Sequence, residues 1–477
     1  MDMKTVTRFA PSPTGFMHVG SLRTALFAWF VAKKNDGKFI LRIEDTDKNR
    51  EVEGSIEHII KTLETLNINF DEGPNKPGDN APYLQSERLD IYLEWGNKLI
   101  EKGRAYADPY SEEEVGEFRE EAKENKHAFL FRNYRPENPP KWDGKTALRF
   151  KSDPKPYRWH DEIMGDLSAG PEAVDDFILI KADGYPTYNF AHIVDDMLMN
   201  VTHIIRSQEF IASVPRFLNL YEALEIEHPV FATVPPVMGP DGKKKLSKRD
   251  GAKDVLDYIS EGYLIETLIN FIASLGWNDG TTQEIYSVDE IKNKFELSHV
   301  QKSGANFDDK RLLWMNGAHI RNLSLDELYE LVKDKLPKEA EKFDKEYKKK
   351  VVGLLQERLK TLNEIDELST FFFEEPIVNL SLIEEHKQLS KEDKGDLKDW
   401  LTKAKETLEQ SDFSIEDLTN KLNTLLEQTG TKPVVLFSLI RIATTHSPQS
   451  PGLFDTLNLL GKEKTLSRLE KTLLEIK

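Results

Sequence analysis

The 477-residue sequence contains no cysteine. This absence excludes disulfide bonds, thiol catalysis and every zinc or iron–sulfur site with cysteine ligands. The sequence also has no apolar run near the ~18 residues that a transmembrane helix needs. Its longest apolar runs, LFAWFVA and VVLFSLI, have the length of core segments. The loop-like segment that starts at Arg8 leaves no room for a signal peptide, so we expect a cytoplasmic protein with no membrane partner.

Positive charges are fewer than negative charges. Lysine and arginine total 65 against 83 aspartate and glutamate residues, and the formal net charge is −18. Phosphate contacts require lysine and arginine, so this balance argues against a protein that binds nucleic acid. A local basic surface can nevertheless act within an acidic protein. A nucleic-acid partner would therefore require the basic residues to gather on one face.

Glycine and proline become rare after residue 323. The first 323 residues hold 21 of the 26 glycines and 18 of the 23 prolines. Later runs such as LDELYELVKDKL and LEKTLLEI have apolar residues at i, i+3, i+4 and i+7, which indicates amphipathic helices. Helix starts are predicted at Ser324, followed by Glu327, and at Ser390, followed by Asp393. Residues 324–477 are therefore predicted to be all-helical.

Before residue 324, predicted strands alternate with predicted helices. The strands are TVTRFA, KFILRIEDTD, VTHIIRS and HPVFAT, and the helices LRTALFAWFVAKK, SIEHIIKTLETL and EFIASVPRFLNLYEAL. This alternation is typical of a parallel α/β sheet. It breaks between about residues 107 and 186, where aromatic and charged residues are frequent. We interpret that stretch as an insertion between two strands of the sheet.

The segment RFAPSPTGFMHVG connects the first predicted strand to a long helix. Ligands of parallel sheets bind at the carboxyl edge, where this segment lies. Pro11 and Pro13 restrict the backbone, whereas Gly15 and Gly20 allow the main chain to approach a ligand. The N–H groups at the helix start suit phosphate, and His18 could donate to a phosphate oxygen. A tight turn without a ligand explains this segment equally well.

A second segment favours the ligand. GPDGKKKLSKRDGA, residues 239–252, carries four lysines and one arginine within seven residues, flanked by glycines. Alone, it would be interpreted as a solvated basic run. Together, the two segments fit a nucleotide whose phosphates are held from two sides. Such a clamp would stabilise charge that moves on to pyrophosphate.

These two segments contain the motifs HVGS (residues 18–21) and KLSKR (residues 245–249). The pair resembles the two signatures of class I aminoacyl-tRNA synthetases, His-Ile-Gly-His and Lys-Met-Ser-Lys-Ser. RFAPSPTGFMHVG, LRIEDTD, GYPTYNFAHIVDD, VTHIIRSQE and LINFIASLGW further resemble glutamyl-tRNA synthetase, in this order. The resemblance extends from residue 8 to about residue 316, and the helical C-terminal region carries no diagnostic motif. Ser21 stands where the first signature has its second histidine, so that contact is absent or replaced.

The resemblance implies that glutamate attacks the α-phosphate of ATP to give glutamyl-adenylate and diphosphate. The glutamyl group would then pass to the 3′ end of tRNA(Glu), for protein biosynthesis. The implied fold is a Rossmann-like catalytic domain with an inserted α+β domain, followed by an all-α region. Its implied parts are two catalytic halves (1–106 and 187–238), an inserted acceptor-stem-binding domain (107–186), a lysine-loop and stem-contact helical domain (239–323) and an anticodon-binding region (324–477). A monomer is expected, with Mg²⁺ accompanying ATP and no zinc.

The resemblance also implies roles for individual side chains. His18, Lys245 and Lys248 would stabilise the phosphates in the transition state. The full ATP-binding set is Pro11, Gly15, His18, Gly20, Lys245, Ser247 and Lys248. The glutamate-binding set is Arg8, Tyr188 and Arg206 for the side-chain carboxylate, with Ser12 and Glu44 for the ammonium group. No protein ligand of a metal is assigned.

Four of the five glutamate-binding assignments have a structural alternative. Arg8 could pair with an aspartate, Glu44 could cap a helix, Tyr188 could belong to the core, and Arg206 could form a surface salt bridge. The closest alternative activity is that of glutaminyl-tRNA synthetase, although the APSPTG form of the loop favours glutamate. Three others stay open: a shortened paralogue that glutamylates a tRNA base, a small nucleotidylyltransferase, and an inactive RNA-binding relative.

The sequence leaves open whether tRNA(Gln) is also a substrate. It also leaves the anticodon-reading residues unassigned. For an acidic chain that binds tRNA, we expect the basic residues to concentrate on one face. Residues 243–249, the insertion and parts of the helical region would contribute to that face.

Overall fold

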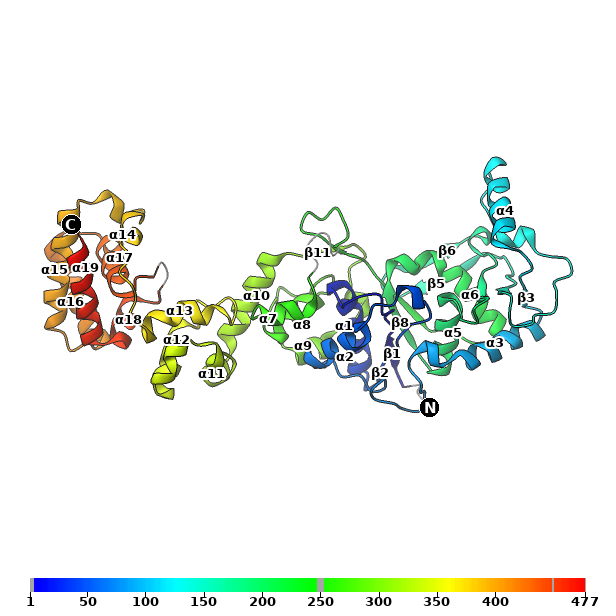
Figure 1. Cartoon of the computed structure of the whole chain (residues 1–477), viewed down its shortest axis with the longest axis horizontal. Helices are drawn as coiled ribbons and strands as arrows, with labels where there is room; N and C mark the ends of the chain where they lie inside the picture. Colours follow the sequence, from blue (N-terminus) through cyan, green and yellow to red (C-terminus); the bar gives the residue numbers. More distant parts are fainter. Residues whose placement is uncertain (1–3, 247–252, 448–449, 477) are drawn as a thin grey trace. The chain divides into compact units, whose positions relative to one another are not determined.

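The structure, a computed structural model, describes residues 4–246, 253–447 and 450–476. Ser247 and Lys248 therefore lie outside the described residues. The chain divides into two compact units, residues 1–258 with 268–309 and residues 259–267 with 310–477, and Figure 1 traces it through both. In the described part of the chain, every strand belongs to the first unit. The second unit is helical, which confirms the prediction from its composition.

Six strands form the main sheet of the first unit. Their order is β2 (Lys38–Leu41), β1 (Val6–Phe9), β8 (His203–Ser207), β9 (Val230–Val234), β5 (Tyr157–Asp161) and β6 (Gly165–Ala169). Neighbouring strands from β2 to β5 are parallel, and β6 is antiparallel to β5. Val6 pairs with Lys38 and Phe9 with Leu41, so β1 and β2 end side by side. The predicted parallel α/β fold is confirmed.

Helices cover both faces of this sheet, as two neighbouring residues of β1 demonstrate. Successive side chains of a strand point to opposite faces. The Thr7 hydroxyl donates to the carbonyl of Ala28 in α1 (Val19–Lys34) at 2.7 Å. Arg8 Nε donates to Asp196 in α5 (Tyr188–Leu198) at 3.0 Å. The α1 and α5 helices therefore lie on opposite faces, and α3 (Leu89–Glu101) and α6 (Val214–Leu224) share the α5 core.

The range predicted as an insertion, together with the two residues before it, contains a second, antiparallel sheet. Its strands are β3 (Ala105–Ala107), β4 (Leu148–Phe150) and β7 (Ile178–Ile180), and α4 (Glu112–Glu124) lies in the same range. Aromatic residues of this range pack on one another, since the Phe118 and Tyr134 rings stack with centroids 4.4 Å apart. Ion pairs of Arg149 with Asp108 and of Arg135 with Asp176 add to it. The strands β5 and β6 also lie in this range, but they belong to the main sheet and not to the second one.

The remaining elements of the first unit are one short strand pair and four helices, as far as the described residues show. The two-residue strands β10 (Val237–Met238) and β11 (Ala305–Asn306) pair with each other. Further helices are α2 (Ser55–Thr65), α7 (Val255–Ser260), α8 (Ile265–Ala273) and α9 (Val288–Lys294), of which α7 and α8 continue into the second unit. The predicted helix EFIASVPRFLNLYEAL begins as a 3₁₀ turn, Gln208–Ser213, and becomes α-helical at Val214.

The second unit has two hydrophobic cores. One core is formed mainly by α10 (Asp309–Asn322), α11 (Leu325–Val332), α12 (Lys345–Leu355) and α13 (Glu364–Phe373). The other core is formed by α14 (Ser381–Glu384), α15 (Lys394–Glu409), α16 (Ile415–Thr429), α17 (Pro433–Thr445), α18 (Leu453–Leu460) and α19 (Lys462–Glu475). None of the described helices in either unit is long and apolar enough to cross a membrane.

One of the two predicted helix starts is confirmed and the other is wrong. Ser324 and Glu327 form a capping box at the start of α11, where the Ser324 N–H donates to Glu327 Oε2 at 2.9 Å. Ser390 caps no helix and lies in a 3₁₀ turn, Leu389–Lys391. Asp393 is the cap of α15 instead, because its carboxylate accepts from the Gly395 N–H at 2.7 Å.

Candidate active site

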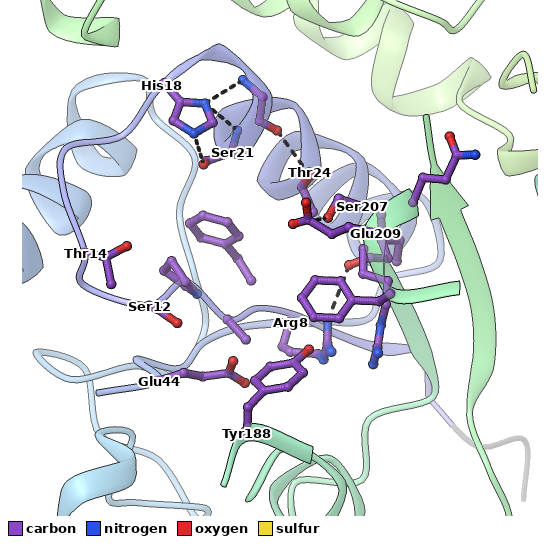
Figure 2. A pocket seen from close by; sticks show the side chains of 18 of the residues that line it. Arg8, Ser12, Thr14, His18, Ser21, Thr24, Glu44, Tyr188, Ser207 and Glu209 are labelled. Atoms are coloured by element: carbon purple, nitrogen blue, oxygen red, sulfur yellow. Dashed lines mark hydrogen bonds between the residues drawn. The ribbon is translucent and has the colours of Figure 1, made fainter. Parts of the chain in front are cut away.

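A cavity of about 1010 Å³ opens at the carboxyl edge of the main sheet, within the first unit. Its size suits a nucleotide together with a small second substrate. Of the residues predicted from the sequence, it is lined by Arg8, Pro11, Ser12, His18, Gly20, Glu44, Tyr188, Arg206 and Lys245. Gly15 lines an adjoining cavity of about 460 Å³, which shares His18 and Lys245 with the first. The loop after β1 and the first residue of the lysine signature therefore face the same space, and Figure 2 labels several of these side chains.

His18 is held in place by the helix that it begins. Its Nδ1 accepts from the N–H groups of Gly20 at 3.1 Å and Ser21 at 3.4 Å, which makes the imidazole the N-cap of α1 (Figure 2). A ring that accepts at Nδ1 carries its hydrogen at Nε2, which lies 3.3 Å from the Ser21 hydroxyl. A Cβ on Gly20 would lie 3.2 Å from the imidazole Cε1. Glycine at this position thus leaves room for the capping ring.

A buried ionic cluster lies beneath the cavity. Its arginines are Arg8, Arg42 and Arg88, its carboxylates Glu44, Asp195 and Asp196, and all six are at least nine-tenths buried. Arg42 donates to Asp196 at 2.7 Å and to Glu44 at 3.0 Å. Arg88 donates to Asp195 at 2.8 Å. The three positive and three negative charges balance within the cluster.

Two carboxyl groups of this cluster have shifted pKa values, in opposite directions. Burial raises the pKa of Glu44 above its usual range, more than Arg42 and Arg8 lower it. Burial also opposes ionisation of Asp196, but Arg42 and Arg8 outweigh it and hold the pKa of this carboxyl well below its usual range. Asp196 is therefore a fixed anion. Glu44 lines the cavity, and a cationic ligand there would stabilise its ionised carboxylate.

The guanidinium of Arg206 is buried, and the described residues give it no hydrogen-bonded anion. Its side chain comes from β8, and the residue is only 6% exposed. The guanidinium lies near the rings of Phe210 and Phe217, at 5.4 and 5.2 Å from their centroids. All three of its nitrogens lack a hydrogen-bond partner among the described residues. A buried cation in this state favours a ligand with a carboxylate.

Tyr188 begins α5 and lines the same cavity as Glu44, and Figure 2 labels both side chains. Its ring stacks on His192 at 4.7 Å and contacts Phe210 at 5.1 Å. Burial raises the pKa of the Tyr188 phenol to about 12. The hydroxyl therefore stays protonated at neutral pH and can donate a hydrogen bond.

Lys245 is the charged residue of the lysine signature that the structure describes. Its main chain bridges to Met238 of β10, and its ammonium group pairs with Glu209 at 3.2 Å. Both side chains of this pair are 59% exposed, so the ammonium group can exchange this partner for a ligand at little cost.

Sequence reasoning missed five buried charged residues at this site, among them Arg88 of the ionic cluster. Arg42, Asp195 and Asp196 stand inside the motifs LRIEDTD and IVDD, which pointed to the region without revealing the ion pairs. Arg23 of α1 lines the cavity and donates to the carbonyls of Leu275, at 2.8 Å, and of Pro235. Burial lowers the pKa of the Arg23 guanidinium to about 10. No local sequence signal marks Arg23.

Comparisons with known proteins agree with this geometry. A family model described as "tRNA synthetases class I (E and Q), catalytic domain" matches residues 4–314, and an "Anticodon binding domain" model matches residues 327–473. The sequence is 40% identical to glutamate–tRNA ligase 2 of Caldicellulosiruptor saccharolyticus over 477 residues, which is 98% of each chain. It is also 40% identical to the glutamate–tRNA ligase of Clostridium botulinum over 484 residues, again 98% of each chain.

Solved structures also match the chain over nearly its whole length. A glutamate tRNA ligase from Elizabethkingia meningosepticum, crystallised in complex with its amino acid, matches with a TM-score of 0.87 and 33% identity. The match covers 99% of this chain and 100% of that one. The chain belongs to the glutamate–tRNA ligases, a family of class I aminoacyl-tRNA synthetases.

Family membership confirms the resemblance inferred from the motifs and decides between the alternatives. A shortened paralogue or a small nucleotidylyltransferase would not match these ligases over 98% of their length. ATP is the nucleotide substrate of class I aminoacyl-tRNA synthetases. The described residues of this ligase include no group of three or more histidine, aspartate and glutamate side chains that could hold a metal ion.

Proposed function

We propose that this ligase activates L-glutamate with ATP and transfers it to the 3′ end of tRNA(Glu). In the first step an oxygen of the glutamate α-carboxylate bonds to the α-phosphorus of ATP, and the bond to diphosphate breaks. In the second step a ribose hydroxyl of the terminal nucleotide takes the glutamyl group, and AMP leaves. The observation that carries the substrate assignment is the buried Arg206 guanidinium without an anion among the described residues.

Glutamate is proposed to bind with its side-chain carboxylate on Arg206. Arg8 and the protonated Tyr188 hydroxyl support that carboxylate from the same cavity. The ammonium group is received by Glu44 and Ser12, since an arriving cation offsets the burial of the Glu44 carboxylate. Free glutamate carries one net negative charge, and Arg206 supplies the positive charge that the balanced ionic cluster does not provide.

ATP is proposed to lie between the two signature loops. His18 Nε2–H, Lys245 and Lys248 stabilise the phosphate charge as it shifts on to diphosphate. Pro11, Gly15 and Gly20 shape the main chain around the nucleotide, and Ser247 contributes from the lysine signature. Mg²⁺ is expected to arrive with ATP, held mainly by phosphate oxygens, because the described residues have no preformed metal cluster.

The tRNA is proposed to contact both units. The range 107–186 and the helices of 239–323 are the proposed acceptor-stem contacts, and the region 324–477 the proposed anticodon contact, which its match to an anticodon-binding domain supports. Whether tRNA(Gln) is a second substrate depends on anticodon-reading residues within that region. We propose a cytoplasmic enzyme that acts as a monomer.

ATP–pyrophosphate exchange in the presence of tRNA tests this function. Glutamate should support the exchange and glutamine should not. Exchange with glutamine instead, or exchange independent of glutamate, would contradict the proposal. Charging of purified tRNA(Glu) and tRNA(Gln) with labelled glutamate then measures tRNA selectivity directly.

A further inference from the structure

His192 is fully buried in α5 and contacts Tyr188 in two ways. The two residues are one helical turn apart, so their side chains meet on one face of the helix. Their rings stack with centroids 4.7 Å apart and planes 15° apart. The imidazole Nδ1 also lies 2.7 Å from the Tyr188 carbonyl oxygen. Because a carbonyl oxygen can only accept, Nδ1 carries the ring hydrogen and donates it.

Phe217 of α6 holds the same imidazole from a second direction. The two rings meet edge to face, with centroids 4.6 Å apart. The Arg206 guanidinium lies 5.2 Å from the centroid of this phenylalanine ring. Phe210 contacts the Tyr188 ring at 5.1 Å and lies 5.4 Å from the guanidinium. The two groups proposed to hold the glutamate carboxylate are thus joined by one aromatic cluster, of which His192 is a member.

The imidazole of His192 is neutral at physiological pH. Its burial and the nearby Arg206 charge hold the pKa of His192 well below its usual range, against the attraction of Asp196. A neutral ring places no second cation beside the Arg206 guanidinium. His192 can therefore act on Tyr188 through two features, its flat ring and its Nδ1–H donor.

We infer that His192 is a positioning residue for glutamate, because its ring fixes the plane of the Tyr188 ring and so the direction of the Tyr188 hydroxyl. An unrestrained phenol would rotate about its side-chain bonds before the substrate arrives. Fixing these rotations in the free enzyme reduces the conformational entropy that is lost when the carboxylate binds. This inference rests on the role proposed above for Tyr188.

The test measures glutamate-dependent ATP–pyrophosphate exchange at saturating tRNA. His192→Leu removes the flat ring and the N–H donor but keeps an apolar side chain in the core. It should raise the KM for glutamate about ten-fold, the effect of one lost hydrogen bond to a charged group. The kcat and the KM for ATP should stay within about three-fold of the wild type, because the affected contact lies at the substrate side chain and not at its reacting carboxylate.

Two further variants separate the ring from the donor. His192→Phe keeps a flat ring in the stack and loses the donor, so its KM for glutamate should stay within about three-fold of the wild type. His192→Asn keeps an N–H donor and loses the ring, so it should resemble His192→Leu. If the phenylalanine variant is as impaired as the leucine variant, or the asparagine variant equals the wild type, the ring does not position Tyr188 and the inference is overturned.

His228→Leu is the matched control. It removes another histidine that stacks on an aromatic ring, that of Phe231, with centroids 5.3 Å apart. His228 is exposed and is not among the residues that line the cavity, so this variant should behave as the wild type. Thermal unfolding of each variant checks the fold. If His192→Leu does not fold, His192→Asn takes its place in every comparison.

Tyr188→Phe distinguishes failure of this inference from failure of the proposed function. It should itself raise the KM for glutamate about ten-fold. Adding His192→Leu to it should cause little further loss, because the hydroxyl that His192 positions is already gone. If Tyr188→Phe leaves this KM unchanged, the proposed role of Tyr188 is wrong and the inference falls with it. If Tyr188→Phe is impaired but His192→Leu equals the wild type, raises the KM for ATP equally, or multiplies the loss in the Tyr188→Phe background, the inference alone is overturned.

Discussion

Replacing Arg206 by methionine should have two effects of opposite sign: a loss of glutamate use and a gain in stability of the free enzyme. Methionine is unbranched and flexible, so it can fill the space near Phe210 and Phe217 without a charge. The guanidinium that it replaces is buried and has no hydrogen-bond partner among the described residues. The cost of burying this charge is present in the free enzyme, whereas its benefit appears only with a bound carboxylate.

The sizes of both effects follow from comparing the free enzyme with the enzyme that has bound a carboxylate. Loss of a buried guanidinium–carboxylate pair costs about 3–5 kcal/mol, so kcat/KM for glutamate should fall by roughly 10²–10³-fold or more. In the free enzyme, removal of an unpaired buried charge should stabilise the fold. Attraction from the Asp196 carboxylate offsets part of the gain, so we expect about 1–3 kcal/mol, or several degrees in Tm.

Glutamate titration of the exchange reaction measures the first effect, and thermal or urea unfolding without substrate measures the second. Arg206→Lys is the matched control because it keeps the charge and loses the planar fork. It should retain more activity than the methionine variant and gain no stability. A methionine variant that binds glutamate within about three-fold of the wild type, or that unfolds more easily than the wild type, would refute the reasoning.

Four other outcomes are expected. Lys245→Ala should raise the KM for ATP about ten-fold in the exchange assay, yet change the free energy of unfolding by less than ~0.5 kcal/mol, since its pair with Glu209 is exposed. Asp196→Asn should cost about 3–5 kcal/mol in urea unfolding, because it leaves Arg8 and Arg42 under-compensated. Burial raises the pKa of Tyr188 to about 12, whereas a tyrosine in the unfolded chain has a pKa of ~10. The contribution of Tyr188 to the free energy of unfolding is therefore complete below pH ~10 and is lost as the pH rises from ~10 to about 12. In a pH series of unfolding curves, Tyr188→Phe should flatten the decline over this range. Affinity for tRNA, measured by filter binding, should fall steeply with added salt, and a salt-insensitive complex would contradict the proposed basic face.

The parts of this site that could be predicted from the sequence are those whose chemistry is local. His18 and Gly20 are two residues apart, and their contact is a consequence of one helix start. The partner of Arg8 is 188 residues away in α5, so no periodicity in either segment could have identified it. That Arg206 has no hydrogen-bond partner among the described residues is harder still to foresee, because Asp196 already pairs with two other arginines.

The β5 strand illustrates a signal that was present but hidden. In YRWHD, Tyr157, Trp159 and Asp161 are buried and alternate with exposed Arg158 and His160. This is the two-residue period of a strand. Charged residues at three of the five positions obscured it, because an aspartate in a buried position resembles a loop residue. Asp161 is tolerated there since it accepts from the N–H and the hydroxyl of Thr233.

The start of α1 explains how one histidine can replace a set of backbone donors. The sequence suggested that phosphate meets the free N–H groups of the helix, but His18 Nδ1 already accepts from Gly20 and Ser21. The positive end of the helix therefore acts through the imidazole, and hydrogen bonds in series polarise one another. Donation into Nδ1 withdraws electron density from the ring and makes Nε2–H a stronger donor. In the proposed binding mode, phosphate would therefore meet a single directed N–H. The Ser21 hydroxyl lies 3.3 Å from this Nε2, and Ser21 stands at the position where the family signature has its second histidine.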